Sequence, residues 1–369
     1  MSMSTASIFN RKARIILCAI IMLLLFMFLF KNMDYTLFSN RFNIYLQMKN
    51  GTVYRVKFLD IPASKQIKPQ TLDNKPRSVT TMTNLATDFN KKLSFLGNLT
   101  YSKGNVQVYN LSLPNNDRFK CVSLRQGKNT PICLYDTKVD LHVSGSLART
   151  GSWEAGYLNQ VKSFLMQRPK AGLIDLGTNL GVYTLFISKT LQRPVLSVEP
   201  YYPTIRRLHK SIKLGKLEKF VTLVVNPITD TRETVYFRRS SNNQGDTRIS
   251  QSKTNDRGLG PNSSHSILMD DLSDVANFTE AVMKVDIQGY EMKAFSHSKR
   301  FLDKVKIFAI FIEWEFYRNS KAHPLVPGFL EEMKARGLKP YSPGRIPLAL
   351  TQWRKWPFDV VFKSDEVKW

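Results

Sequence analysis

A short segment near the middle of the chain combines a buried strand, a glycine-containing loop and the start of a helix. Residues 173–176 are apolar except for Asp175, and the loop that follows places Gly177, Asn179 and Gly181 at alternate positions. Glycine lets the backbone lie close to a ligand, and open α/β sheets bind ligands at the carboxyl ends of their strands. The pattern predicts a nucleoside-bearing cofactor at this loop.

The loop differs from the one that binds dinucleotides. A dinucleotide-binding loop has the pattern G-x-G-x-x-G, because its backbone lies against a pyrophosphate. Here Asn179 occupies the second glycine position. The departure favours S-adenosylmethionine, which has no phosphate but carries an ammonium group that a loop carboxylate such as Asp175 can pair with.

A second apolar strand, residues 194–198, ends at Glu199 and is followed by Pro200. A carboxylate at this place can accept hydrogen bonds from both ribose hydroxyls of a nucleoside. The alternative is that Glu199 only begins the next helix, where its charge interacts favourably with the helix dipole. The order strand, glycine loop, helix, strand and acid favours the ribose contact.

A third apolar strand, residues 281–285, becomes polar at its carboxyl end, where Asp286 and Glu291 follow Lys284. These side chains are expected at the same rim of the sheet as the glycine loop. A structural ion pair between Lys284 and Asp286 is the alternative. Charges within a buried strand are costly unless they are paired or used, so the pattern favours a functional site.

Together these motifs resemble the FkbM-type family of S-adenosylmethionine-dependent O-methyltransferases, over roughly residues 150 to 365. The motifs, in order, are D-x-G-x-N-x-G-x-Y-T at 175–184, V-E-P at 198–200, D-D-L at 270–272, K-x-D-x-x-G-Y-E at 284–291 and I-x-x-E at 310–313. The G-S-W-E segment at 151–154 also resembles the lead-in of the family. One residue departs from the pattern, since Gln288 stands where the family usually has Glu.

The resemblance implies an α/β fold with a Rossmann-like methyltransferase sheet, mostly parallel, whose last strand is antiparallel. We expect that last strand at residues 358–362. The resemblance also implies S-adenosyl-L-methionine as cofactor. The residues expected to bind it are Glu154, Asp175, Gly177, Thr178, Asn179, Gly181, Tyr183, Thr184, Glu199 and Pro200.

Methyl transfer to an alcohol needs a group that accepts the hydroxyl proton, and a carboxylate at the strand rim can act as this general base. Asp286 is the first choice and Glu313 the second, with Lys284 holding Asp286 or polarising the acceptor. A divalent metal bound by Asp286 and a neighbouring carboxylate is an alternative that no tight ligand spacing supports. Histidines are expected on the surface, namely His209, His265 and His323.

The amino terminus predicts a membrane anchor. Residues 15–30 carry no charge and follow Arg11, Lys12 and Arg14. The run is shorter than the usual span of about 20 residues but longer than the apolar part of a signal peptide, and no cleavage site follows. The basic residues before it predict a cytoplasmic tail and a luminal enzyme, as in a single-pass type II Golgi membrane protein. A cleaved signal peptide is the alternative.

Two further features fit a secretory protein. N-x-S/T sequons occur at Asn98, Asn110, Asn262 and Asn277, although such triplets also arise by chance. Cys121 and Cys133 flank a turn-rich stretch, and an oxidising lumen would permit a disulfide between them. Two free buried cysteines are the alternative.

The predicted organisation is a tail at 1–14, a transmembrane signal anchor at 15–30, a stem or linker at 31–92, a small β-rich lead-in at 93–148 and the methyltransferase domain at 149–369. Residues 238–264 are rich in Ser, Asn and Gly. They predict either a long loop over the rim of the site or an insertion without function.

The net charge of +25 would ordinarily suggest nucleic acid. The anchor argues against that partner, and a solvated basic surface is the preferred account, with an acidic acceptor or an anionic surface as alternatives. We therefore expect an O-methyltransferase that modifies a sugar hydroxyl on glycans. The alternatives are methylation of a lipid or small metabolite, and a degenerate fold that binds glycans or proteins without catalysis. The sequence does not indicate an oligomeric state.

Overall fold

The computed structural model describes residues 35–40, 43–48, 53–57, 98–239, 243–250, 263–318 and 323–369. The chain divides into two compact units, residues 1–77 and 78–369. In the first unit, strands β1 (Tyr35–Asn40), β2 (Asn43–Met48) and β3 (Val53–Lys57) form an antiparallel sheet within the segment that the sequence assigns to a stem.

The predicted anchor at 15–30 and the proline-containing segment at 60–92 lie outside the described residues. Within the described ranges, no helix has both the length and the apolar character needed to cross a bilayer.

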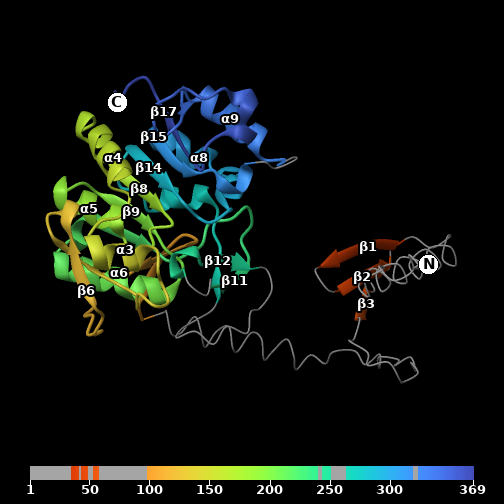
Figure 1. Cartoon of the computed structure of the whole chain (residues 1–369), viewed down its shortest axis with the longest axis horizontal. Coiled ribbons are helices and arrows are strands. Elements are labelled where there is room, and N and C mark those ends of the chain that lie inside the picture. Colours follow the sequence, from red (N-terminus) through yellow and green to blue (C-terminus); the bar gives the residue numbers. More distant parts are fainter. Residues whose placement is uncertain are drawn as a thin grey trace, which may run out of the picture. The chain divides into compact units, whose positions relative to one another are not determined.

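In the second unit, the described residues form a nine-stranded sheet in the order β16-β17-β15-β14-β8-β9-β10-β5-β4 (Figure 1). Its strands are β4 (Thr100–Lys103), β5 (Val106–Tyr109), β8 (Gly172–Leu176), β9 (Val195–Val198), β10 (Val221–Val224), β14 (Glu280–Val285), β15 (Lys306–Glu313), β16 (Lys339–Tyr341) and β17 (Asp359–Lys363). Strands β15, β14, β8, β9 and β10 are parallel, whereas β17 runs antiparallel to β15. The predicted mostly parallel sheet with an antiparallel last strand is confirmed.

Helices cover both faces of this sheet because its central strands are apolar on both sides. In β8, Leu173 packs into a core with helices α4, α5 and α6, whereas Ile174 packs into a second core with α7, α8 and α9. The helices are α3 (Val143–Thr150), α4 (Ala155–Gln167), α5 (Val182–Thr190), α6 (Tyr202–Gly215), α7 (Glu291–Phe295), α8 (Lys299–Lys304) and α9 (Val326–Ala335).

The order in which the chain adds strands to the sheet reverses at β8. From β8 the chain continues to β9 and β10 on one side, and later returns on the other side as β14 and β15. The carboxyl ends of β8 and β14 lie next to each other, and the Asp286 N–H donates to the Leu176 carbonyl over 3.0 Å. Open α/β sheets bind their ligands at such a switch point, so Gly177 and Asp286 mark the place to search for a site.

The segment before β8, for which the sequence predicts a small β-rich lead-in, contributes two strands to the central sheet. Strand β5 pairs antiparallel with β10, and β4 pairs with β5, so both strands extend the central sheet. A hairpin of β6 (Cys121–Leu124) and β7 (Thr130–Cys133) packs against α6. Farther along the chain, β11 (Thr234–Arg238) pairs with β12 (Arg248–Ser250) and β13 (Ser263–His265) in a small sheet.

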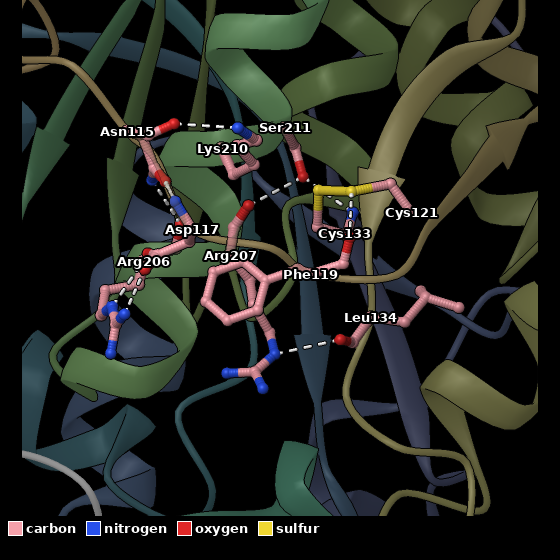
Figure 2. The surroundings of a disulfide bond; sticks show 10 residues. All are labelled: Asn115, Asp117, Phe119, Cys121, Cys133, Leu134, Arg206, Arg207, Lys210 and Ser211. Carbon is pink, nitrogen blue, oxygen red and sulfur yellow. Dashed lines mark hydrogen bonds and ion pairs between the residues drawn. A yellow bond between two sulfur atoms is a disulfide. The ribbon is translucent and has the colours of Figure 1, made fainter.

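Cys121 and Cys133 form a disulfide across the β6–β7 hairpin, where they are directly opposite each other (Figure 2). The hairpin is also bonded to α6, because the Cys133 N–H donates to the Ser211 hydroxyl over 2.9 Å and the Arg207 guanidinium donates to the Leu134 carbonyl over 3.0 Å. Of the two alternatives for the cysteines, the structure has the disulfide.

Replacing both Cys121 and Cys133 with Ser should lower the free energy of unfolding by about 2–3 kcal/mol, because the crosslink restricts the unfolded chain over a short loop. Urea denaturation of the oxidised wild type and the double variant measures the difference. Equal midpoints, with the disulfide verified by mass spectrometry in the wild type, would contradict the assigned role.

Candidate functional site

The loop after β8 is pressed against the end of β14. Gly177 has φ +78°, and a Cβ atom at this position would lie 1.7 Å from the Asp286 carbonyl oxygen. The N–H groups of Gly177 and Thr178 both donate to the Val198 carbonyl over 3.0 Å, which fixes the loop to β9 as well. Glycine is required here because no side chain fits between the two strand ends.

Asp175 lies beneath the loop, where it holds α5. Its carboxylate is fully buried and accepts a hydrogen bond of 2.7 Å from the Thr184 hydroxyl, which also bonds to Ser197 over 2.6 Å. Burial raises the pKa of Asp175, although Lys284 and Thr184 oppose the shift. The sequence placed this carboxylate against the cofactor ammonium, but it lines neither of the cavities described below.

Gly181 and Thr184 also lie away from both cavities. Gly181 precedes α5 with φ +91°, and a Cβ atom there would lie 2.3 Å from the Leu208 side chain of α6. These two residues, predicted to bind cofactor, instead pack α5 against its neighbours. Thr178 stabilises the turn, since its hydroxyl donates to the Asp175 carbonyl over 2.7 Å.

Two cavities meet at the switch point. The first, which we call the Glu199 cavity, is lined by Gly177, Asn179, Val198, Glu199, Pro200, Tyr201, Thr204, Pro227, Ile228, Phe237, Gln244, Gly245, Thr247, Ile249, Asp286, Ile287 and Gln288. Its walls combine a carboxylate with apolar side chains from β11 and β12. Such a lining suits a nucleoside, whose base is flat and apolar on its faces and whose ribose carries hydroxyls.

Glu199 is held in place by the glycine loop. Its two carboxylate oxygens accept backbone hydrogen bonds of 2.9 Å from Asn179 and Tyr201. Burial raises the pKa of Glu199 to about 7, although these two backbone bonds lower it. Glu199 and Gly177 line the same cavity, where the sequence predicts that Glu199 binds the ribose of a nucleoside.

The second cavity, which we call the Glu313 cavity, shares part of its lining with the first. It is lined by His142, Val143, Trp153, Glu154, Thr178, Asn179, Leu180, Val182, Tyr183, Asn243, Gly245, Lys284, Asp286, Gln288 and Glu313. Asn179, Gly245, Asp286 and Gln288 line both cavities. A group held at their junction would be within reach of molecules bound on either side.

Lys284 and Asp286 form an ion pair at this junction. The Lys284 ammonium donates to an Asp286 oxygen over 3.0 Å and to the Gly177 carbonyl over 3.3 Å. Burial would lower the pKa of Lys284, but the carboxylates of Asp286, Asp175 and Glu154 outweigh it and raise that pKa. Burial likewise opposes ionisation of Asp286, yet the Lys284 ammonium holds the pKa of Asp286 below its usual value.

Glu313 differs from Asp286 in charge. Burial, followed by the negative charges of Asp286 and Glu291, raises the pKa of Glu313 to about 9. At neutral pH Asp286 is therefore ionised and Glu313 is protonated, and this difference favours Asp286 as the proton acceptor. Two neighbouring carboxyl groups with separated pKa values are a typical arrangement for acid–base chemistry.

Gln288 bridges the two carboxyl groups. Its amide nitrogen donates to Asp286 over 2.7 Å and to Glu313 over 3.2 Å. The turn that carries Gln288, at φ +56°, is stabilised by the buried Glu291, whose carboxylate accepts from the N–H groups of Ile287 and Gly289. A carboxylate in place of this amide could not donate to either group without a proton, so the departure from the family pattern leaves the pair fully bonded.

Glu154 lies in the Glu313 cavity and accepts a hydrogen bond of 2.6 Å from the Tyr183 hydroxyl. Burial raises the pKa of Glu154, whereas Lys284 and Tyr183 oppose the shift. The structure thus brings Glu154, Tyr183, Lys284, Asp286 and Glu313 into one cavity, whereas the sequence assigns the first two to cofactor binding and the other three to catalysis.

Sequence reasoning missed part of this cavity. His142 and Trp153, which precede α3 and α4, line it, although the sequence singled out only Glu154 from this region. For residues 238–264 the sequence predicts either a long loop over the rim or an insertion without function. The described part pairs as β11, β12 and β13, and Gln244 and Gly245 between β11 and β12 line the cavities, with a Cβ atom at 245 placed 2.6 Å from the Asn179 side chain. Residues 251–262 lie outside the described part.

The histidine prediction is wrong for His209. This residue is 1% exposed and packs edge-on against Tyr109 with ring centroids 5.0 Å apart. Burial lowers its pKa, which keeps the ring neutral within the core. His265 is exposed, as predicted, and His323 is half-buried.

The acids of the D-D-L motif at 270–272 bond to neighbouring segments. Asp271 accepts from the Arg232 guanidinium over 2.8 Å, and Asp270 accepts from the Phe301 N–H at the start of α8 over 3.0 Å. Within the described ranges, no three His, Cys, Asp or Glu side chains are placed to bind a metal ion together.

Comparison with known proteins identifies the domain. A family model for the methyltransferase FkbM domain matches residues 175–339. No curated protein sequence matches the chain. Residues 175–339 thus match a methyltransferase domain, for which S-adenosylmethionine is the implied cofactor.

Solved structures with similar folds include several methyltransferases. The METTL16 methyltransferase domain is 13% identical with a TM-score of 0.32, and the match covers 56% of this chain and 66% of that one. A TehB-like SAM-dependent methyltransferase from Corynebacterium glutamicum is 15% identical with a TM-score of 0.34, and the match covers 60% of this chain and 94% of that one. A putative O-methyltransferase from Klebsiella pneumoniae is 13% identical with a TM-score of 0.32, and the match covers 58% of this chain and 82% of that one.

Replacing Glu199 with Ala should weaken S-adenosylmethionine binding by about 1–3 kcal/mol, the scale for losing hydrogen bonds to a charged group. Isothermal titration calorimetry measures the affinity. Lys299→Ala, at an exposed ion pair on α8, is the control that should bind as the wild type does. Unchanged affinity in a folded Glu199 variant would remove Glu199 from the cofactor site.

Proposed function

We propose that this protein is an O-methyltransferase that methylates a sugar hydroxyl on glycans of the secretory pathway. The observation that carries the proposal is the position of Asp286, which lines both cavities and is bonded to Lys284 and Gln288. The Glu199 cavity suits the cofactor and the Glu313 cavity suits the acceptor. An acceptor hydroxyl that attacks the methyl group would have to lie at the junction of the two cavities, and a carboxylate there can take its proton.

Bound S-adenosylmethionine supplies a methyl group that is already electrophilic. The protein then has to align the acceptor oxygen with that methyl, exclude water and remove one proton. Asp286 would take the hydroxyl proton as the new carbon–oxygen bond forms and the methyl carbon–sulfur bond breaks, with the bonding electrons left on the sulfur of the thioether product. The acidity of the hydroxyl rises steeply in this step, so a carboxylate of low pKa is basic enough.

Neighbouring groups keep Asp286 ready for this role. Lys284 balances its charge before the proton arrives, and Gln288 orients the oxygen that faces Glu313. Gly245 lies close to the Asn179 side chain, so the segment before β12 packs on the glycine loop.

For localisation, we propose a single-pass type II protein of the Golgi membrane, with residues 15–30 as anchor and the enzyme in the lumen. The Cys121–Cys133 disulfide supports this compartment, because disulfides persist in oxidising environments. The proposed partners are a glycan acceptor and the membrane, without nucleic acid.

Two experiments test the proposal. Incubation of the full-length chain with labelled cofactor and a panel of sugars, alcohols and lipids should label sugars at oxygen, as mass spectrometry of the released methylated monosaccharides would show. Labelling at nitrogen, or of lipids alone, would contradict it. In sealed microsomes the sequons should be glycosylated and the domain protected from protease; bare sequons with an accessible domain would refute the luminal location.

A further inference from the structure

We propose that the Glu313 cavity binds an electrically neutral pyranose, whose apolar face stacks on Trp153. The proposal rests on the proposed function, because it names the acceptor for the same site. It also excludes sugars with a carboxylate, sulfate or phosphate close to the reacting hydroxyl.

The charges around the cavity oppose an anionic acceptor. Its lining includes the carboxyl groups of Glu154, Asp286 and Glu313, whereas Lys284 is the single lysine or arginine among the described residues that line it. Lys284 already contacts Asp286 and the Gly177 carbonyl, so its charge is balanced within the site. A negative group on the ligand would be repelled by the Asp286 carboxylate and would find no free lysine or arginine among the described lining residues, which disfavours its binding.

The same lining suits hydroxyl groups. Gln288 and Glu313 present amide and carboxyl groups, and Asn243 and His142 add further donors and acceptors at the margin. Hydroxyls can donate to a carboxylate and accept from an amide, so they match a set of mixed polar groups without a net positive charge. A pyranose presents several such hydroxyls around its ring.

Trp153 supplies the flat surface. It is half-buried, packs against the core beside α4 and lines the cavity. The electron-rich face of an indole attracts the slightly positive C–H groups on the apolar face of a sugar ring. The combination of one large aromatic with a few polar groups is typical of small-molecule sites that recognise orientation as well as shape.

The loop that carries Trp153 is fixed before any ligand binds. The Ser152 carbonyl accepts from the hydroxyls of Ser146 and Thr150, each over 3.1 Å. Gly151 has φ +65°, and a Cβ atom there would lie 2.8 Å from the Ser123 carbonyl oxygen. On the other side, Glu154 is bonded to Tyr183. A surface fixed at both ends loses little conformational freedom when a sugar binds.

The test uses binding and turnover in parallel on the full-length chain with S-adenosylhomocysteine or labelled cofactor. The ligands are two matched pairs: methyl glucopyranoside and methyl galactopyranoside, each with its C6 uronic acid. Saturation-transfer NMR should detect binding of at least one neutral glycoside, with its uronic acid bound about tenfold more weakly or worse, equivalent to about 1.4 kcal/mol.

Substitutions at Trp153 test whether this residue binds the neutral glycoside. Trp153→Ala should weaken binding of the neutral glycoside about tenfold, Trp153→Phe should retain most of it, and cofactor affinity should change in neither. Met166→Ala, at a residue that is 60% exposed on α4, is the matched surface control. If Trp153→Ala does not fold, the comparison of Trp153→Phe with the wild type across the four glycosides remains informative.

The outcomes separate the two proposals. Preferred binding of uronic acids, no binding of any glycoside, or a neutral glycoside that binds Trp153→Ala as tightly as the wild type would overturn the neutral-pyranose site. Binding of neutral glycosides through Trp153 without methyl transfer to any hydroxyl would overturn the proposed O-methyltransferase and leave the binding site intact.

Discussion

Replacing Asp286 with Asn is expected to lower turnover by about 10²-fold or more, the usual scale for losing a general base. Asn keeps the size of Asp and an oxygen that can accept from Lys284, and the Gln288 amide can rotate to accept from the new amide. The variant therefore keeps the contacts of the site but cannot take up the hydroxyl proton. Single-turnover assays with saturating labelled cofactor measure the effect.

Glu313→Gln is the matched control. With a pKa of about 9, Glu313 is protonated at neutral pH, so Gln replaces it with a neutral group of the same shape. We expect a much smaller loss of turnover than for Asp286→Asn, and nearly unchanged cofactor affinity in both. If Glu313→Gln abolished turnover while Asp286→Asn retained it, the two roles would be exchanged. Activity in both variants would place the base elsewhere.

Replacing Gly177 with Ala should lower the free energy of unfolding by about 2–5 kcal/mol. The left-handed conformation of Gly177 costs an L-residue about 1–2 kcal/mol. The added Cβ atom would lie 1.7 Å from the Asp286 carbonyl oxygen, so the ends of β8 and β14 would have to separate, and such overpacking costs about 1–3 kcal/mol. Urea denaturation measures the loss, and cofactor binding should disappear with it.

Gly156 provides the comparison. It lies in α4 with no atom within 4 Å of an added Cβ, so Gly156→Ala should leave the protein as stable or raise its stability by about 0.5–1 kcal/mol. A stable Gly177→Ala protein that still binds cofactor would show that the strand ends tolerate separation and that the close approach has no functional role.

The sequence predicted the order of elements well because its signals are local. Apolar runs at 173–176, 194–198 and 281–285 each form a parallel strand, and Glu199 and Asp286, which follow the second and third runs, line the same cavity. The carboxyl ends of parallel strands meet at one rim of the sheet, so the sequence alone predicts that Glu199, Asp286 and the glycine loop lie close together.

The sequence could not show which acids face a ligand. Asp175 and Glu199 occupy similar places after apolar residues, yet Asp175 bonds to Thr184 beneath the loop and Glu199 lines a cavity. The difference depends on side-chain packing between α5 and β9, which no periodicity encodes. Trp153 belongs to the G-S-W-E segment that resembles the family, but the motif alone does not show that this side chain lines a cavity.

Strands β4 and β5 have a consequence for making shorter versions of this protein. They precede the segment that matches the family model, yet they complete one side of the sheet by pairing with β10. A fragment that began at residue 149 would leave the hydrogen-bonding groups of β10 unpaired and open to strands of other molecules. Exposed sheet edges of this kind promote aggregation, so the soluble catalytic unit has to include the residues from Thr100 onward.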